Sequence, residues 1–362
     1  ASGATAALDL NGFTLGTAEG LTLSGASLAT GGLQNTSSTA VSYSGQIVLT
    51  TGAGTIIANY GDINITATGN MTGNTFGLTI GGAGNGTFAS QLNTTSGTLT
   101  KNGLGFWTVS GASSTFTGLV TVSAGTLKLG AAGDASNTPL GGNGTGGVSI
   151  TSGATFDLNG FTLGTAEALA INGTGIASTG GIGAFINSSN NSISYSGVIT
   201  PGATSRLANY GTGLLTLTGN IVGSTRAITF VTVGDITQSS ASVWSGTSTS
   251  LIKEGSGTLI LAGQNSFTTG TVTVSTGVLR LGASGGATNT PLGTSGAGTT
   301  VALGAVLDLS TFNLGGASTY ETLGISGTGI KNGGALISSA ASGTTYFGAT
   351  TITANSIVTN SA

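Results

Sequence analysis

Two lysines and three aspartates recur at matching places in this chain of 362 residues, and they are the residues best placed to do chemistry. Lys101 and Lys253 each stand two positions before a glycine, and Asp9, Asp157 and Asp308 occupy the sequences LDL, FDL and LDL. A repeated lysine could contact an anion or a partner, and a repeated carboxylate could bind a cation. Because the chain has no His and no Cys, catalysis that needs an imidazole or thiolate is excluded, as are structural zinc sites and disulfides.

A structural interpretation of these residues is favoured over a chemical one. Calcium takes about six to eight oxygen ligands, and no second acid lies within a few residues of the aspartates. We therefore expect the aspartates to be outward polar residues in strands whose Leu neighbours face the core. Glu19 and Glu167 recur in the same way and have the same interpretation. We expect Lys101 and Lys253 to be turn-facing charges that hinder lateral strand pairing.

Other residues also allow two interpretations. Trp107 and Trp244 could be surface platforms for sugars, but a lone aromatic residue in a strand more often packs in the core or at an edge. Thr-x-Thr pairs would form an ice-binding array if they fell on nearly every coil. Their spacing is irregular, however, and Thr is common in strands for other reasons. The pairs are at 66–68, 98–100, 216–218, 271–273 and 351–353. Asn-x-Ser/Thr sequences are frequent enough to be expected by chance, and they include Asn35, Asn70, Asn143 and Asn172.

Composition narrows the function classes further. The chain has 68 Gly, 7 Lys and Arg, 10 Asp and Glu, a net charge of −3 and a mean hydropathy of +0.36. Such a chain is neither disordered nor collagen-like. Nucleic-acid binding is not expected because the basic residues are scattered, and membrane insertion is not expected because no run approaches 18 apolar residues. Glycoside hydrolysis needs paired carboxylates, which so few acids hardly allow. We predict no enzyme, and no catalytic, cofactor-binding or metal-binding residue.

Internal repetition predicts the architecture. Residues 99–130 return at 251–282, NTPLG at 137–141 returns at 289–293, and LDLNGFTLGTAE at 8–19 returns as FDLNGFTLGTAE at 156–167. A weaker copy, LDLSTFNLGGAS, lies at 307–318. A unit of about 150 residues therefore recurs, and we predict module 1 at 1–150, module 2 at 151–301 and a partial module 3 at 302–362, in one continuous rod.

Within the modules, Val, Ile, Leu and Phe alternate with Thr and Ser, which is typical of strands, and Gly and Asn clusters mark turns. The repetition at two levels favours an all-β chain, a β-solenoid with coils of roughly 20 residues, over a barrel or sandwich.

The two 32-residue segments resemble the autotransporter passenger-associated β-strand repeat, a pattern of L-x-K-x-G-x-G, an aromatic residue, a Val-rich strand and G-T-L-x-L-G. The matching residues of the first copy are Leu99, Lys101, Gly103, Gly105, Gly111, Phe116, Gly118, Val120, Val122, Gly125, Leu127, Leu129 and Gly130. Those of the second are Leu251, Lys253, Gly255, Gly257, Gly263, Phe267 or Thr268, Gly270, Val272, Val274, Gly277, Leu279, Leu281 and Gly282. The resemblance implies a right-handed parallel β-helix that is displayed outside a bacterial cell.

We therefore expect a structural extracellular protein that forms or extends a fibre by coil stacking, with copies of itself as partners. Neither end shows a capping segment, which predicts continuation by more chain or by another copy, and the low charge predicts lateral bundling. The alternative is an adhesin or passenger stalk that binds surface glycans or neighbouring cells. No cofactor is expected in either case.

Overall fold

The computed structural model describes residues 6–25, 32–142, 146–177, 180–223, 225–247, 249–268, 270–294, 298–315, 320–340 and 343–360. The chain divides into two compact units. Unit 1 contains residues 1–170 and 175–185, and unit 2 contains residues 171–174 and 186–362. Strands β20 (Leu169–Gly173) and β21 (Phe185–Asn187) contain residues of both units.

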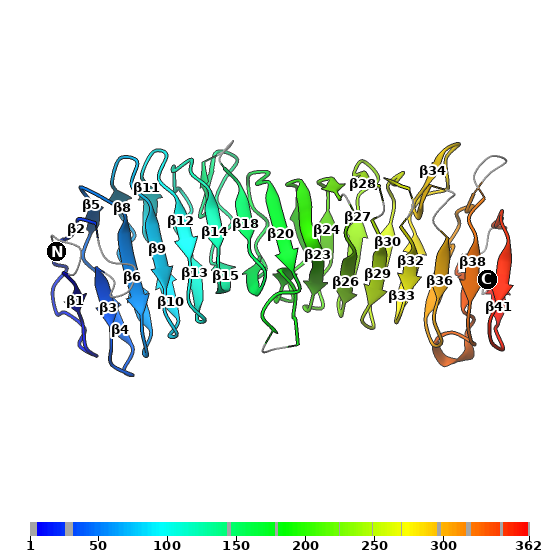
Figure 1. Ribbon diagram of the computed structural model, residues 1–362, viewed down its shortest axis with the longest axis horizontal. Helices are drawn as coiled ribbons and strands as arrows, with labels where there is room; N and C mark the ends of the chain where they lie inside the picture. Colours follow the sequence, from blue (N-terminus) through cyan, green and yellow to red (C-terminus); the bar gives the residue numbers. More distant parts are fainter. Residues whose placement is uncertain are drawn as a thin grey trace. The chain divides into compact units, whose positions relative to one another are not determined.

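Unit 1 is built of short strands that lie side by side in three columns of parallel strands (Figure 1). The first column contains β1 (Leu8–Asp9), β3 (Leu33–Asn35), β6 (Gly54–Ala58), β9 (Leu78–Gly81), β12 (Leu99–Lys101), β14 (Val120–Val122) and β18 (Val148–Ile150). The second contains β4 (Val41–Tyr43), β7 (Ile63–Ile65), β10 (Gly86–Phe88), β13 (Phe106–Val109), β15 (Gly125–Leu129) and β19 (Ala154–Asp157). The third contains β2 (Leu21–Leu23), β5 (Ile47–Leu49), β8 (Asn70–Thr72) and β11 (Gln91–Asn93).

Unit 2 repeats this three-column plan. Its first column contains β23 (Ile199–Asn209), β26 (Ile228–Thr232), β29 (Leu251–Glu254), β32 (Val272–Val274), β36 (Thr299–Val301), β38 (Leu323–Ile325) and β40 (Thr350–Ile352). The second contains β22 (Ile193–Tyr195), β24 (Leu215–Leu217), β27 (Ile236–Gln238), β30 (Thr258–Leu261), β33 (Val278–Leu281), β37 (Val306–Asp308), β39 (Leu336–Ser338) and β41 (Val358–Asn360). The third contains the start of β23, β25 (Ile221–Val222), β28 (Trp244–Gly246) and β31 (Ser266–Phe267).

The coils vary in length more than expected. The register pairs Trp107 with Leu127 and then Leu127 with Phe156, so the second of these two coils is much longer than the first. The longer coils accommodate small antiparallel hairpins at the NTPLG sequences. These are β16 (Asn137–Thr138) with β17 (Gly141–Gly142), and β34 (Asn289–Thr290) with β35 (Gly293–Thr294). The expected length of roughly 20 residues therefore holds for the first of these coils and not for the second, because the hairpin is inserted without disturbing the stacked strands.

The core lies inside the coils, where alternate residues of each strand point. Leu33, Ile56 and Ile80 pair in register in the first column and are all fully buried. Since every inward residue packs on its counterpart in the neighbouring coil, the alternation in sequence becomes continuous apolar rows.

The structure confirms an all-β fold of parallel strands stacked as a β-solenoid. Its described residues also include one short 3₁₀ turn at Ile330–Asn332, and among them there is no helix with the length and apolarity to cross a membrane. The right-handed sense of the coil and the three-module division stay predictions.

Candidate functional site

The two repeated lysines lie inside the coils. Lys101 is the last residue of β12, and its side chain points into the core. Its register partners are Ile80 in the preceding coil and Val122 in the following one. Lys253 has the same kind of place in β29, and both side chains are 0% exposed. The expectation of a turn-facing charge is therefore wrong: each lysine interrupts an apolar row of the core.

Each buried ammonium group is held by three backbone carbonyls, an arrangement that we call a lysine cradle. The carbonyl acceptors of Lys101 Nζ are Asn102 O at 2.7 Å, Gly103 O at 2.7 Å and Ala124 O at 3.0 Å. Those of Lys253 Nζ are Glu254 O at 3.0 Å, Gly255 O at 2.9 Å and Thr276 O at 2.9 Å. Two acceptors lie in the turn after the lysine and the third in the next coil, so each cradle ties two coils together.

The cradle geometry depends on glycine. Gly103 and Gly255 have φ angles of 70° and 84°. The turn that points its carbonyls at the lysine needs these positive angles, which residues other than glycine rarely adopt. Burial lowers the pKa of Lys101 to about 7. Burial also lowers the pKa of Lys253 to about 8, with the carboxylates of Asp235 and Glu254 acting in the opposite direction.

The three repeated aspartates shape turns and join coils. In each case the carboxylate accepts the backbone N–H two residues later, from Asn11, Asn159 or Ser310, and these three residues have positive φ. Asp9 is exposed, as expected, and also accepts bonds from the N–H and the hydroxyl of Thr36 in the next coil.

Asp157 and Asp308 are buried, so the expectation of outward polar residues is wrong for these two. The reason is an ion pair with the preceding coil. Lys128 Nζ lies 3.5 Å from Asp157 Oδ2, and Arg280 Nε donates to Asp308 Oδ2 at 2.7 Å. Lys128 and Arg280 occupy equivalent positions of the two 32-residue segments, so the ion pair recurs with the repeat.

The recurring glutamates lie two residues before a strand of the solenoid. Glu19 is exposed and accepts a bond from Thr17 Oγ1 at 3.0 Å. Glu167 accepts one from Thr165 Oγ1 at 2.7 Å, but it is buried, so the outward expectation is wrong for it.

Glu321 stands in the same place, two residues before β38. Its Oε1 accepts a bond from Thr299 Oγ1 at 2.9 Å, and its buried Oε2 has no hydrogen-bond partner. Burial raises the pKa of Glu321 to about 7, against the effect of the Thr299 hydroxyl. The hydroxyl of Tyr346 donates to the backbone carbonyl of Glu321, as that of Tyr43 does to Glu19.

Both tryptophans belong to the core, which agrees with the favoured interpretation. Trp107 is fully buried and its Nε1 donates to Gly81 O at 3.2 Å. Trp244 is 3% exposed and stacks on Phe230, with ring centroids 4.8 Å apart and planes at 5°. Neither ring offers a surface to a sugar.

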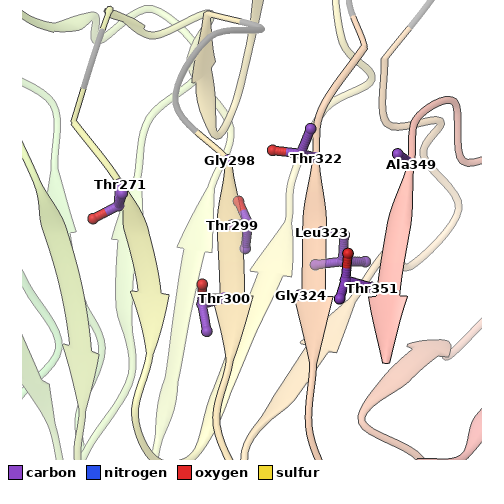
Figure 2. A pocket seen from close by; sticks show the side chains of 9 residues that line it. All are labelled: Thr271, Gly298, Thr299, Thr300, Thr322, Leu323, Gly324, Ala349 and Thr351. Carbon is purple, nitrogen blue, oxygen red and sulfur yellow. The ribbon is translucent and has the colours of Figure 1, made fainter. Parts of the chain in front are cut away.

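The threonines form interrupted rows rather than a flat array. On the outer face of unit 2, the successive pairs are Thr271 and Thr273, Gly298 and Thr300, Thr322 and Gly324, and Ala349 and Thr351. Because glycine and alanine alternate with threonine, side chains are missing from the rows and a hollow of about 270 Å³ results, shown in Figure 2. Its lining offers hydroxyls and no charge.

The Asn-x-Ser/Thr sequences are scattered over different environments. Asn35 is fully buried, and its side chain donates to Thr39 O at 2.8 Å. Asn70 is exposed and Asn172 is half-buried, while Asn143 lies outside the described residues.

Taken together, the recurring lysines and aspartates bond between successive coils, while Glu19 and Glu167 accept local bonds from threonines two residues earlier. Within the described part of the chain, no three acidic side chains gather where they could hold a metal ion. The pairs Lys128–Asp157 and Arg280–Asp308 were missed from the sequence. The sequence pattern that could have predicted these ion pairs is a basic residue at the same strand position of both copies, Lys128 and Arg280, with an aspartate one coil later.

No curated protein and no solved structure matches the chain. The family model described as passenger-associated-transport-repeat matches residues 99–129 and 251–281. These are the two segments that contain the lysine cradles and the basic partners of the ion pairs. The chain therefore contains two copies of the repeat that is found in autotransporter passengers.

Proposed function

We propose that this chain is a structural, non-enzymatic part of an extracellular protein of a bacterial surface, and that it forms or extends a fibre by coil stacking. The observation that carries the proposal is the use of its recurring polar residues. Lys101, Lys253, Asp157 and Asp308 are buried and bond to a neighbouring coil. Groups used in this way stabilise the stack and are not presented to a substrate.

The β-solenoid itself supports extension. Each coil presents a row of backbone N–H and C=O groups and an apolar interior to the next coil. The same surfaces can receive a coil from more chain or from another copy, a contact that does not close and so gives filaments.

The passenger repeats support the location. Two matched segments of this family suggest a secreted or cell-surface protein. The scarcity of charged side chains suits such a place, because few ionised groups respond to changes in external salt.

The mass of the assembly in solution tests the proposal. Light scattering over a range of protein concentrations should show growth well beyond the chain mass of 34.5 kDa. A chain that stays monomeric at high concentration would contradict fibre formation. Activity against polysaccharides that disappears on changing one acidic residue would contradict a non-enzymatic role.

A passenger stalk that binds glycans or neighbouring cells is the second candidate. It is favoured by the hollow of unit 2, whose threonine hydroxyls suit a neutral polar ligand (Figure 2). Binding to a glycan array that is lost when Gly324 is changed to Gln, which fills the open space above that residue, would support this candidate. Unchanged binding by the G324Q variant would remove the hollow as its basis.

A further inference from the structure

Unit 1 exposes an apolar stripe along one corner of its coils. The stripe consists of Tyr60, Ala83, Leu104 and Phe106. Tyr60 is 74% exposed and Leu104 is 78% exposed, and Phe106 at the start of β13 is 42% exposed. Soluble proteins rarely expose contiguous apolar patches larger than a few hundred Å², and such patches mark interaction sites.

The first three residues of the stripe occupy the same turn of three successive coils, because each stands directly before a glycine that packs against the preceding coil. The N–H of Gly84 donates to Ala58 O at 2.8 Å, and that of Gly105 donates to Gly82 O at 3.0 Å. A Cβ atom on Gly105 would lie 1.9 Å from Gly84 O, so the turns are in direct contact. The outward side chains beside these glycines therefore form a row along the stacking direction.

The polar groups beside the stripe are already used between coils. Asp62 Oδ1 accepts the N–H of Asn85 at 2.9 Å, and Asn85 Oδ1 accepts the N–H of Phe106 at 3.1 Å. Lys128 lies 5.5 Å from the centroid of the Phe106 ring and 3.5 Å from the Asp157 carboxylate. A glycan needs several hydrogen-bonding groups beside an aromatic ring, and here the oxygens Asp62 Oδ1 and Asn85 Oδ1 are already engaged. An apolar, neutral surface suits the stripe better.

We propose that the stripe is a lateral contact between copies of this chain. The inference rests on the proposed fibre, in which copies lie close together. A row that runs along the stacking direction can pack against the same row of a second copy, as an isologous contact requires. With 17 charged residues in 362 and a net charge of −3, two copies repel each other little.

The size of the stripe sets the strength of the contact. A large aromatic side chain offers on the order of 200 Å², so these four side chains provide roughly 400 Å² per copy at their observed exposure. Two copies would bury about 800 Å² in total, below the ~1,200 Å² of a standard stable interface. A single contact is therefore weak, and many contacts along two fibres add up to a bundle.

Disulfide trapping tests the contact, because the chain has no Cys of its own. Leu104→Cys places a thiol in the stripe. Ser256→Cys is the matched control, since Ser256 is also exposed and stands at the equivalent position of the second repeat, before Gly257. Under mild oxidation we expect the L104C variant to form disulfide dimers at least five-fold faster than the S256C variant. Equal rates would overturn the proposal.

A double variant separates the lateral contact from the fibre. Tyr60→Ser with Leu104→Ser removes the two most exposed side chains of the stripe without touching the core, and a circular dichroism spectrum checks the fold. We expect electron micrographs of this variant to show single fibres where the unchanged chain shows bundles. Bundles that persist in the variant would overturn the lateral contact. If the L104C variant forms disulfide-trapped pairs at the expected rate while the unchanged chain forms no fibres, the lateral contact stands and the fibre proposal fails.

Discussion

Replacing Lys101 by Met tests whether a lysine cradle stabilises the coil stack. Methionine has a similar length and fills the same place, so no large cavity forms, but it has no donors for the three carbonyls at 2.7, 2.7 and 3.0 Å. Each carbonyl that loses its partner costs about 1 kcal/mol at a turn that water can partly reach. Part of this loss, about 1 kcal/mol, is recovered because a charge no longer has to be buried. We expect a net loss of about 2 kcal/mol in the free energy of unfolding.

The assay must be local, because repeat proteins do not always unfold in one step. Hydrogen exchange followed by mass spectrometry should show faster exchange in the peptide around residues 99–125 of the K101M variant. Lys331→Met is the control, since Lys331 is exposed and a surface substitution of this kind changes the free energy of unfolding by about 0.5 kcal/mol or less. An exchange rate in K101M equal to or slower than that of the unchanged chain would refute the reasoning, because it would mean that burial of the ammonium outweighs its bonds.

The pH dependence gives an independent check on the same residue. Burial lowers the pKa of Lys101 from 10.5 to about 7, so between these values the folded chain has released a proton that the unfolded chain still binds. The free energy of unfolding must therefore rise with pH across this range. Protection of the same peptide should rise between pH 7 and 9 in the unchanged chain and rise less in the K101M variant.

Three further predictions concern other buried or exposed charges. Asp308→Asn should lower the midpoint of urea unfolding by the equivalent of about 2 kcal/mol, because an amide cannot accept all the bonds that the buried carboxylate accepts from Arg280, Ser310 and Ser339. Burial raises the pKa of Glu321 from 4.5 to about 7, so stability should fall as pH rises from 4.5 to 7, and the E321Q variant should not show this fall. Limited trypsin digestion should cut first after the exposed Arg226 and Lys331, and a first cut after the buried Lys101 would contradict the cradle.

Much of the fold could be predicted from the sequence because a solenoid is built from local alternation. The strand residues that alternate inward lie inside the coils, as the period of two predicts; within 99–130 they include Leu99, Val109, Val120, Val122, Leu127 and Leu129. The coil length could not be predicted in the same way. It depends on where hairpins such as the one at residues 137–142 are inserted, and a hairpin leaves the alternation on either side unchanged.

The environment of the charged residues was predicted less well, for a physical reason. Alternation places Lys101 on the same side as Leu99, which is inward, but a lone cation is normally excluded from a core. Three backbone carbonyls accept hydrogen bonds from the ammonium and so offset the cost of burying it. Two of these carbonyls belong to a glycine turn, and the shape of that turn could not be predicted from the sequence pattern. The partners of Asp157 and Asp308 were likewise hidden, since they lie a whole coil earlier in the chain and meet the acids only through the coil register.

Electron microscopy of the purified chain at high concentration is the most direct test of whether copies of this chain extend a fibre by coil stacking. Stacking between copies predicts unbranched fibres of uniform width with an axial repeat of about 4.8 Å, the spacing between stacked strands. Images that show only separate particles of the size of one chain at every concentration would contradict it.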